Sequence, residues 1–275
     1  MKRRDFITRA GLGAVGASIY RSQPLHAQGA RWERDGVGAV ARFGVLTPAF
    51  DPVPESEMWA MVPPGVSIHA ARVPRIGDQR AFAEPPYVDD ATEQLVGLAP
   101  HVILFAFTSS SYALGAEADS HVRARLEQRA KGIPVMLTCP TATAILRVLG
   151  VRRISIIHPP WFTDATNDQG SAYFRAQGFD VVQCTRMEPA RSFGEVSPTE
   201  LFEFVSAHTP RTAEAVFIGG NGLRAVGAIR ALEARLRIPV LSANQVLMCA
   251  ALRAVGRDET VTRYGSIFSR RELGR

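Results

Sequence analysis

The chain has 275 residues, of which 46% are hydrophobic and 21% are charged. This balance is typical of a folded globular protein and argues against a disordered chain. The formal net charge is +6, but residues 1–27 alone carry four of these six charges. The small remaining excess, without a basic stripe of interleaved aromatic residues, does not favour nucleic acid as a partner.

Residues 1–27 have the pattern of an export signal. Arg3-Arg4-Asp5-Phe6-Ile7 resembles the twin-arginine motif, and a weakly apolar stretch interrupted by Arg9 follows it. The small residue Ala27 suits cleavage by a signal peptidase. We therefore expect a twin-arginine-type signal peptide, recognition by the twin-arginine export machinery, and a periplasmic location. A disordered basic tail is the alternative, and the segment is too short and polar for a permanent membrane span.

Downstream of the signal, apolar strands alternate with segments of helical spacing. The first strand is predicted at Gly44–Pro48, another at Val102–Phe107, and Arg153–Ile157 begins a second series. Helical spacing follows in four segments: Asp89–Leu98, Glu117–Lys131, Asn167–Gln177 and Pro198–Ala207. Near-continuous apolar strands joined by helices indicate parallel sheets covered on both faces.

An internal repeat divides this series in two. Residues 131–154 and 236–259 share Ile-Pro-Val, a short apolar strand, a polar turn and a helix, with Gly150 and Gly256 suited to left-handed helix caps. The repeat predicts an α/β fold of two similar Rossmann-like halves related by a pseudo-two-fold axis, with a ligand cleft between them. We assign residues 38–147 to the first half and 148–243 to the second, with a C-terminal helical segment, 244–275, packing back on the first.

In such folds, ligands bind beyond the carboxyl ends of the strands. The run Thr108-Ser109-Ser110-Ser111 lies at one of these exits, and it is followed by Tyr112. Its hydroxyls could hold a carboxylate, or they could merely cap the following helix. The other exits to consider are Thr47–Asp51, Thr138–Thr141, His158–Thr163, Gly219–Asn221 and Ser242–Asn244.

The sequence gives little sign of a metal or cofactor. The mature chain has three cysteines, Cys139, Cys184 and Cys249, with no CxxC pair and no His/Cys cluster at ligand spacing. Gly219–Gly222 is glycine-rich but lacks the pattern of a dinucleotide fingerprint, and a P-loop lysine is absent. We therefore expect neither a metal nor a cofactor.

Four ordered segments carry a family resemblance. Gly44–Pro48, the Thr108-Ser109 exit, Gly150–Ile154 and Ile238–Gln245 are similar to the aspartate/glutamate racemase superfamily, and closest to its maleate cis-trans isomerase and arylmalonate decarboxylase branch. The likeness covers about residues 38–268. It implies cofactor-independent chemistry on a small carboxylate held between the halves by hydroxyls and backbone N–H groups, through an enediolate-like species. The substrate-binding residues that it implies are Asp51, Thr108, Ser109, Trp161, Gly220, Asn221 and Asn244.

The sequence departs from this family at its two usual catalytic cysteines. Phe107 occupies the position of the first and Gly220 that of the second. Their loss argues against two-base racemisation and removes the nucleophile for maleate isomerisation. Decarboxylation is less affected, because groups that stabilise an oxyanion can act while another residue supplies the proton.

Three residues are candidates for that proton donor. Cys139 ends a predicted strand, but a buried, inert thiol is the alternative. Tyr112 would need strong tuning, since its unperturbed pKa is about 10. His158, at a strand exit, is either a proton carrier or a hydrogen-bonded turn residue.

Two functions remain open from the sequence. The first is an exported, cofactor-independent decarboxylase or isomerase. The second is a non-catalytic periplasmic protein that binds a carboxylate on the same fold. Either could form a homo-oligomer.

Overall fold

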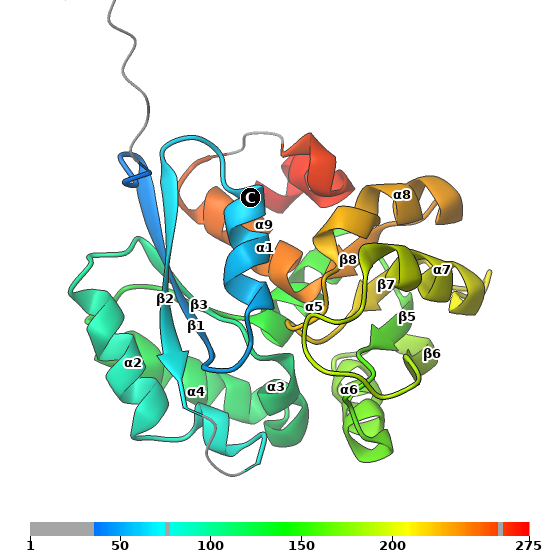
Figure 1. The fold of residues 1–275 in the computed structure, drawn as a ribbon, viewed down its shortest axis with the longest axis horizontal. Helices are drawn as coiled ribbons and strands as arrows, with labels where there is room; N and C mark the ends of the chain where they lie inside the picture. Colours follow the sequence, from blue (N-terminus) through cyan, green and yellow to red (C-terminus); the bar gives the residue numbers. More distant parts are fainter. Residues whose placement is uncertain (1–35, 75–77, 258–260, 275) are drawn as a thin grey trace, which may run out of the picture. The chain divides into compact units, whose positions relative to one another are not determined.

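The fold contains two four-stranded parallel sheets in the arrangement that the repeat predicts. The computed structural model describes residues 36–74, 78–257 and 261–274, so the proposed signal at residues 1–27 lies outside the described part. Residues 36–275 form one unit. The first sheet has the strand order β2-β1-β3-β4 and the second the order β6-β5-β7-β8 (Figure 1). The same order in both copies confirms the predicted α/β fold.

The first sheet is built from buried strands with helices between them. Its strands are β1 (Ala41–Pro48), β2 (Val66–Val73), β3 (Val102–Phe105) and β4 (Val135–Leu137). Its helices are α1 (Val53–Met61), α2 (Tyr87–Val96), α3 (Thr108–Leu114), α4 (Ala116–Arg129) and α5 (Thr138–Val148). All four β3 residues are buried, as expected for a central strand covered on both faces.

The second sheet repeats this plan. Its strands are β5 (Arg153–His158), β6 (Asp180–Arg186), β7 (Ala215–Ile218) and β8 (Val240–Ser242). Its helices are α6 (Asp164–Ala176), α7 (Pro198–His208) and α8 (Val226–Leu236), and α9 (Ala243–Ala254) follows β8. Short 3₁₀ turns lie at Ala81–Ala83, Thr262–Tyr264, Ser266–Ser269 and Arg271–Gly274.

Local chemistry explains where several helices begin and end. Helix α6 starts three residues before the predicted segment because the Thr163 side chain caps it by accepting the Thr166 N–H. Ser197 and Glu200 form a capping box at the start of α7. Gly150 and Gly256 adopt φ of 69° and 68° after α5 and α9, which confirms the predicted left-handed caps.

Helix α9 joins the two halves. It follows the last strand of the second sheet but packs against α5 and α1 of the first (Figure 1). Its residues are almost all buried, including Val246, Leu247 and Met248. A helix apolar on every side is expected where it is surrounded by other elements.

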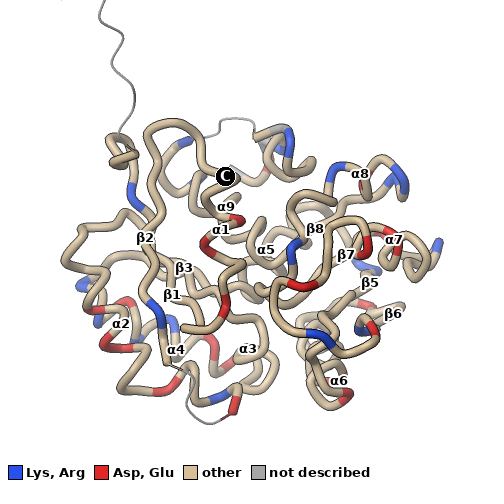
Figure 2. Tube along the Cα trace, in the orientation of Figure 1, with Lys and Arg blue, Asp and Glu red and all other residues tan. Residues whose placement is uncertain are grey.

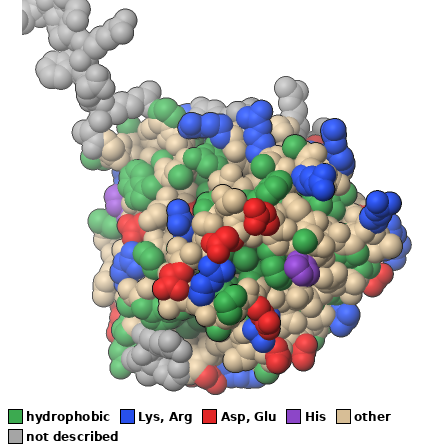
Figure 3. Space-filling view, turned by 45° about the vertical axis from the view of Figure 1, so that its right-hand side comes forward, with side chains coloured by type: hydrophobic (Ala, Val, Ile, Leu, Met, Phe, Trp, Pro, Cys, Tyr) green, Lys and Arg blue, Asp and Glu red, His purple; other side chains and the backbone are tan. Residues whose placement is uncertain are grey.

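Several charged side chains form ion pairs between elements. Acidic positions on α2 (Figure 2) include Asp89, which pairs with Arg125 and Arg129 of α4 at 3.1 and 3.3 Å. On the face in Figure 3, acidic and basic side chains mix with hydrophobic ones at the centre, and basic ones gather at the upper right. Within the described residues, the helices are too short or too polar to cross a bilayer.

Candidate functional site

A cavity of about 430 Å³ lies where strand exits of the two sheets meet. Six of the seven sequence-predicted binding residues line it, namely Asp51, Thr108, Ser109, Trp161, Gly220 and Asn221. The seventh, Asn244, is buried and reaches the site only through Asn221. The carboxyl ends of β1, β3 and β7 thus supply one wall, as the topology of parallel sheets predicts.

The exits of β3 and β7 touch each other through Thr108 and Asn221. Asn221 Oδ1 accepts the Thr108 backbone N–H at 2.9 Å and its hydroxyl at 2.6 Å. The Thr108 hydroxyl oxygen in turn accepts the Gly220 N–H at 3.3 Å. These three contacts join the halves directly, and they occupy donors that the resemblance would have given to a bound carboxylate.

A buried relay continues from Asn221 to Glu57. Asn221 Nδ2 donates to Asn244 Oδ1 at 2.9 Å, and Asn244 Nδ2 donates to Glu57 Oε2 at 2.8 Å. Glu57 Oε1 accepts the N–H of Val226 at 3.0 Å. Because Glu57 Oε2 is the acceptor for Asn244 Nδ2, it fixes the orientation of the Asn244 amide, which then fixes that of Asn221. Burial raises the pKa of Glu57 to about 7 despite these donors.

The four consecutive hydroxyls have different surroundings. Thr108 belongs to the contact between the halves, Ser110 donates to the Phe107 carbonyl at 3.0 Å, and Ser111 donates to Asp119 Oδ1 at 2.8 Å. Ser109 lines the cavity, and its hydroxyl has no hydrogen-bond partner within the described chain. Of the four hydroxyls, Ser109 is therefore the one free to meet a ligand.

Aromatic rings form a large part of the remaining wall. Trp161 packs on Phe193 with ring centroids 4.5 Å apart, and Phe50 meets Phe193 at 5.0 Å. On the other side, Phe107 packs on Phe82 at 4.3 Å. Such a wall suits a flat or apolar substituent, while the polar groups at the strand exits suit an anion.

Asp51 is a buried carboxylic acid on the cavity wall. It is 2% exposed, and its Oδ1 accepts the Val53 N–H at 3.0 Å. Burial raises its pKa to about 6, although the Val53 N–H and the nearby charge of Arg72 act in the opposite direction.

The three predicted proton donors lie behind the wall rather than on it. Cys139 is fully buried, its Sγ is 3.7 Å from the Thr108 carbonyl oxygen, and burial raises its pKa well above the usual range. Tyr112 OH lies 3.0 Å from His158 Nε2. None of these side chains lines the cavity. A role in proton transfer would require each of them to move, so it stays a prediction.

Two glycines leave the space that the Tyr112–His158 pair occupies. A Cβ at Gly170 would lie 2.6 Å from His158 Cε1, and a Cβ at Gly219 would lie 2.7 Å from His158 Cδ2. Side chains at either position would displace the imidazole, which is why the chain needs glycine at these two places. Burial lowers the pKa of His158 to about 4, so the ring is neutral near pH 7.

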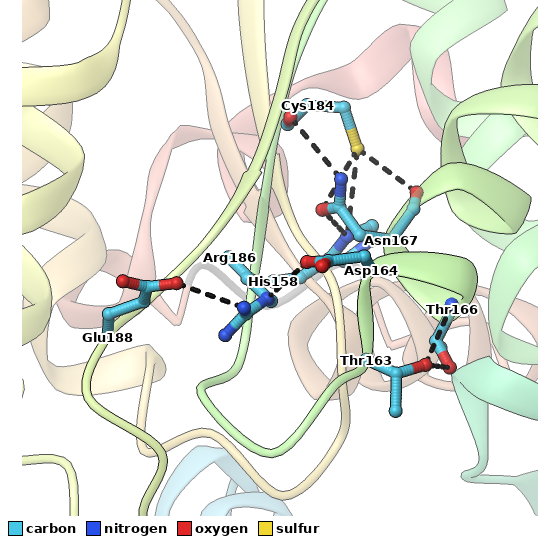
Figure 4. Close-up of polar contacts among 8 residues, drawn as sticks. All are labelled: His158, Thr163, Asp164, Thr166, Asn167, Cys184, Arg186 and Glu188. Atoms are coloured by element: carbon cyan, nitrogen blue, oxygen red, sulfur yellow. Dashed lines mark hydrogen bonds and ion pairs between the residues drawn. The ribbon is translucent and has the colours of Figure 1, made fainter.

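The far side of His158 faces a polar cluster away from the cavity. Figure 4 shows Asn167 between His158 and Cys184, with Asn167 Oδ1 2.9 Å from His158 Nδ1. Close by, Arg186 pairs with Asp164 and Glu188, each at 3.0 Å. Cys184 borders a groove on this side, and burial raises the pKa of its thiol to about 12. Both nitrogens of His158 therefore have partners within the protein.

The two positions at which the resemblance predicts a lost cysteine, Phe107 and Gly220, have different environments. Phe107 precedes α3 with φ of −150° and places its ring on the cavity wall. Gly220 has φ of +85°, and a Cβ built there would lie 2.7 Å from Pro159 Cγ. A side chain at residue 220 would therefore be strained by the backbone and blocked by Pro159.

Sequence reasoning missed several residues of the site, among them Glu57, Arg80, Phe50, Phe82 and Phe193. A signal existed for Glu57, because it shares a helical face with Val53 and Met61, four residues away on either side. Phe193 lies in an irregular loop, where no periodicity identifies it. A metal site is not indicated, since the described residues contain no group of three or more His, Cys, Asp or Glu that could hold an ion.

Comparisons with solved structures identify the fold. An unliganded arylmalonate decarboxylase superposes with a TM-score of 0.71 at 22% identity, covering 83% of this chain and 99% of its own. A maleate isomerase from Pseudomonas putida S16, in complex with maleate, gives 0.75 at 19% identity, with coverages of 83% and 97%. A maleate cis-trans isomerase variant from Nocardia farcinica, with a covalent succinylcysteine intermediate, gives 0.74 at 19%, with coverages of 83% and 98%.

A family model supports the same assignment from the sequence. A search of curated proteins finds no match. The family model described as arylmalonate decarboxylase matches residues 86–268, which is most of the chain. Together with the two-sheet fold, this match shows that the chain belongs to the arylmalonate decarboxylase family, one of the two that the sequence resembles.

Proposed function

We propose that this protein is a cofactor-independent enzyme that acts on a small carboxylate with an apolar or aromatic substituent, through an enediolate-like intermediate. The observation that carries the proposal is the cavity itself, with polar strand exits from both halves on one side and aromatic rings around them. The Ser109 hydroxyl is free to donate to a carboxylate oxygen. Neutral donors in a site shielded from water can stabilise developing negative charge strongly.

The substrate class follows from the two kinds of wall. A ring of the ligand would pack among Trp161, Phe193 and Phe82, while its carboxylate would meet Ser109 and the Asn221–Gly222 turn. The Arg80 side chain lines the same cavity and offers a cation for a second carboxylate. An arylmalonate has these three features, and a solved family member is named for that substrate class.

Binding and turnover of two probes test this function. We expect purified protein to bind phenylmalonate by calorimetry and to release carbon dioxide and phenylacetate, followed by NMR. Maleate tests the isomerase chemistry of the structural neighbours in the same assay. Replacing Ser109 by Ala should weaken phenylmalonate binding by about tenfold or more, the loss of one hydrogen bond to a charged group. Absence of binding to both probes would refute the proposal.

A carboxylate-binding protein without catalysis is the second candidate. One observation favours it: Phe107 and Gly220 leave the cavity without a thiol at either family position. The same experiment separates the two functions. Tight binding of phenylmalonate that persists for hours without product identifies a binding protein, and product formation identifies an enzyme.

The proposal includes export to the periplasm through the signal at residues 1–27. Export is supported by the paired Arg3 and Arg4 and by the weakly apolar stretch, interrupted by Arg9, that follows them. Replacing both arginines by lysine should retain the protein in the cytoplasm of a bacterial host. Equal periplasmic recovery of the two forms in cell fractions would show that the segment is not a twin-arginine signal.

A further inference from the structure

We propose that Asp51 is the residue that transfers the proton in this cavity, taking the task for which the family uses a thiol. The inference rests on the proposed function, because it concerns the same site and the same enediolate-like species. It depends on where Asp51 lies, how its two carboxylate oxygens are held, and which other acids are within reach.

Asp51 is the buried acid among the described residues that line the cavity. The other lining carboxylic acid, Asp78, is exposed and accepts the backbone N–H groups of Arg80 and Ala81 at 2.8 and 3.3 Å. The described lining contains no cysteine, histidine or tyrosine. Of the groups with a titratable proton, Asp51 is therefore the one shielded from water on the wall.

The two carboxylate oxygens of Asp51 have different surroundings. Oδ1 is anchored by the Val53 N–H, and the backbone carbonyl of the same residue accepts Arg72 Nη1 at 3.0 Å. Oδ2 faces the turn of the second half, since a Cβ built on Gly222 would lie 2.7 Å from it. Gly222 adjoins Asn221, which bonds Thr108. One oxygen is thus held still while the other borders the polar end of the cavity.

The acid form of Asp51 is accessible near neutral pH. Burial raises its pKa to about 6, and a carboxylate bound beside it would raise the pKa further by like-charge repulsion. The charged groups around it come from α1, β2 and the opposite side of the cavity: Glu55, Glu57, Arg72, Asp78 and Arg80. Arg72 favours the ionised form of Asp51, but it is shared with Glu55 at 2.7 Å.

In the decarboxylation of a malonate, Asp51 would supply the proton that replaces the lost carboxylate. The bond from the central carbon to one carboxylate breaks, carbon dioxide leaves, and the electron pair remains as an enediolate. The protonated Asp51 donates its proton to that carbon, forming the C–H bond and the monocarboxylate product. The Asp51 carboxylate then regains a proton from water. No oxidant, reductant or cofactor is needed.

Calorimetry of phenylmalonate binding in buffers of different ionisation enthalpy tests the assignment. At pH 7 the wild-type protein should take up about one proton for each ligand bound, because the ligand's charge drives Asp51 to its acid form. Asp51→Asn keeps the size of the side chain and the bond to Val53 but cannot titrate. We expect it to bind phenylmalonate with no proton uptake and to lose turnover by about 100-fold or more. Asp119→Asn is the matched control, because Asp119 is also a buried acid with a pKa of about 6 but does not line the cavity. It should behave as the wild type in both respects.

The outcomes separate this inference from the function on which it rests. Proton uptake or turnover that is unchanged in a folded Asp51→Asn variant would overturn the role of Asp51 and leave the carboxylate site standing. Absence of phenylmalonate and maleate binding in the wild type would overturn both. Should Asp51→Asn fail to fold by circular dichroism, Asp51→Glu keeps an acid on a longer arm. It should then retain proton uptake with reduced turnover, and lost uptake would contradict the assignment.

Discussion

The two halves contribute to the cavity in opposite ways at equivalent strand exits. After β3 the chain offers side chains, with the Phe107 ring on the wall and the Ser109 hydroxyl beside it. After β7 it offers backbone and space, because Gly219, Gly220 and Gly222 surround a single functional side chain, Asn221. Both copies of the repeat thus keep the same sheet, while the exit of β3 supplies side chains to the cavity and the exit of β7 leaves space for a ligand.

Gly220 gives the largest expected effect. Replacing it by Ala places a side chain at φ +85° and against Pro159, so we expect a loss of about 2–5 kcal/mol in unfolding free energy. Gly150 is a matched control, since it has φ of +69° but nothing within 4 Å of its built Cβ. Gly150→Ala should cost only the backbone strain. Equal losses for the two variants in urea unfolding would show that Pro159 places no constraint on residue 220.

Glu57 should make stability depend on pH. Burial raises its pKa from 4.5 to about 7, so the folded chain retains a proton that the unfolded chain has lost. Its contribution to stability is complete below pH 4.5 and decreases as the pH rises to about 7. The decrease should amount to about 3 kcal/mol, and Glu57→Gln should abolish that part. Urea unfolding at pH 5 and pH 8 measures it.

The same Glu57→Gln variant tests the relay that connects the two exits. The amide that replaces the carboxylate would set an N–H against the Val226 N–H or against Asn244 Nδ2, so phenylmalonate binding should weaken about tenfold. Asp119→Asn is the control, because Asp119 is also buried with a pKa of about 6 but bonds only Ser111 and Tyr173. It should change the pH dependence of stability without changing binding. If both variants bind alike, the relay does not orient Asn221.

Phe107 gives the smallest expected change in stability. Its ring is half-buried, so Phe107→Ala should cost about 1–2 kcal/mol, less than a fully buried ring would. The variant enlarges the cavity on the first-half side. We therefore expect its affinity for naphthylmalonate, relative to phenylmalonate, to rise when both are measured by calorimetry. An unchanged ratio would place the ligand's ring elsewhere in the cavity.

Much of the fold could be predicted because alternation and repetition are local signals. The apolar runs at Val102–Phe105 and Ala215–Ile218 each fit a strand covered on both faces, and the matched Ile-Pro-Val segments reveal the second copy. The same reasoning predicts that the Thr108 and Asn221 exits face each other, but with a ligand between them. The direct hydrogen bond that joins these two residues does not follow from it.

The partners of each side chain could not be predicted in this way. The sequence shows four hydroxyls in a row but not the direction of each side chain. The helical geometry of α3 points Ser109 and Ser111 in different directions, and Ser111 bonds Asp119. The position of Cys139 at the end of a predicted strand favours a thiol near the cavity, yet Cys139 lies in the first turn of α5 and is fully buried. The burial of Glu57 and the approach of Phe193 depend on contacts between distant segments, which composition and spacing do not encode.

The relay between the halves also determines how a ligand can reach the cavity. Separating the two sheets would break the hydrogen bonds that join Asn221 to Thr108 and Asn244 to Glu57, at about 1 kcal/mol for each bond. The edge contact between the Phe50 and Phe193 rings can open without disturbing any bond of that relay. We therefore expect a ligand to enter past these two rings through local motion of their loops. The strand exits should keep their positions during entry.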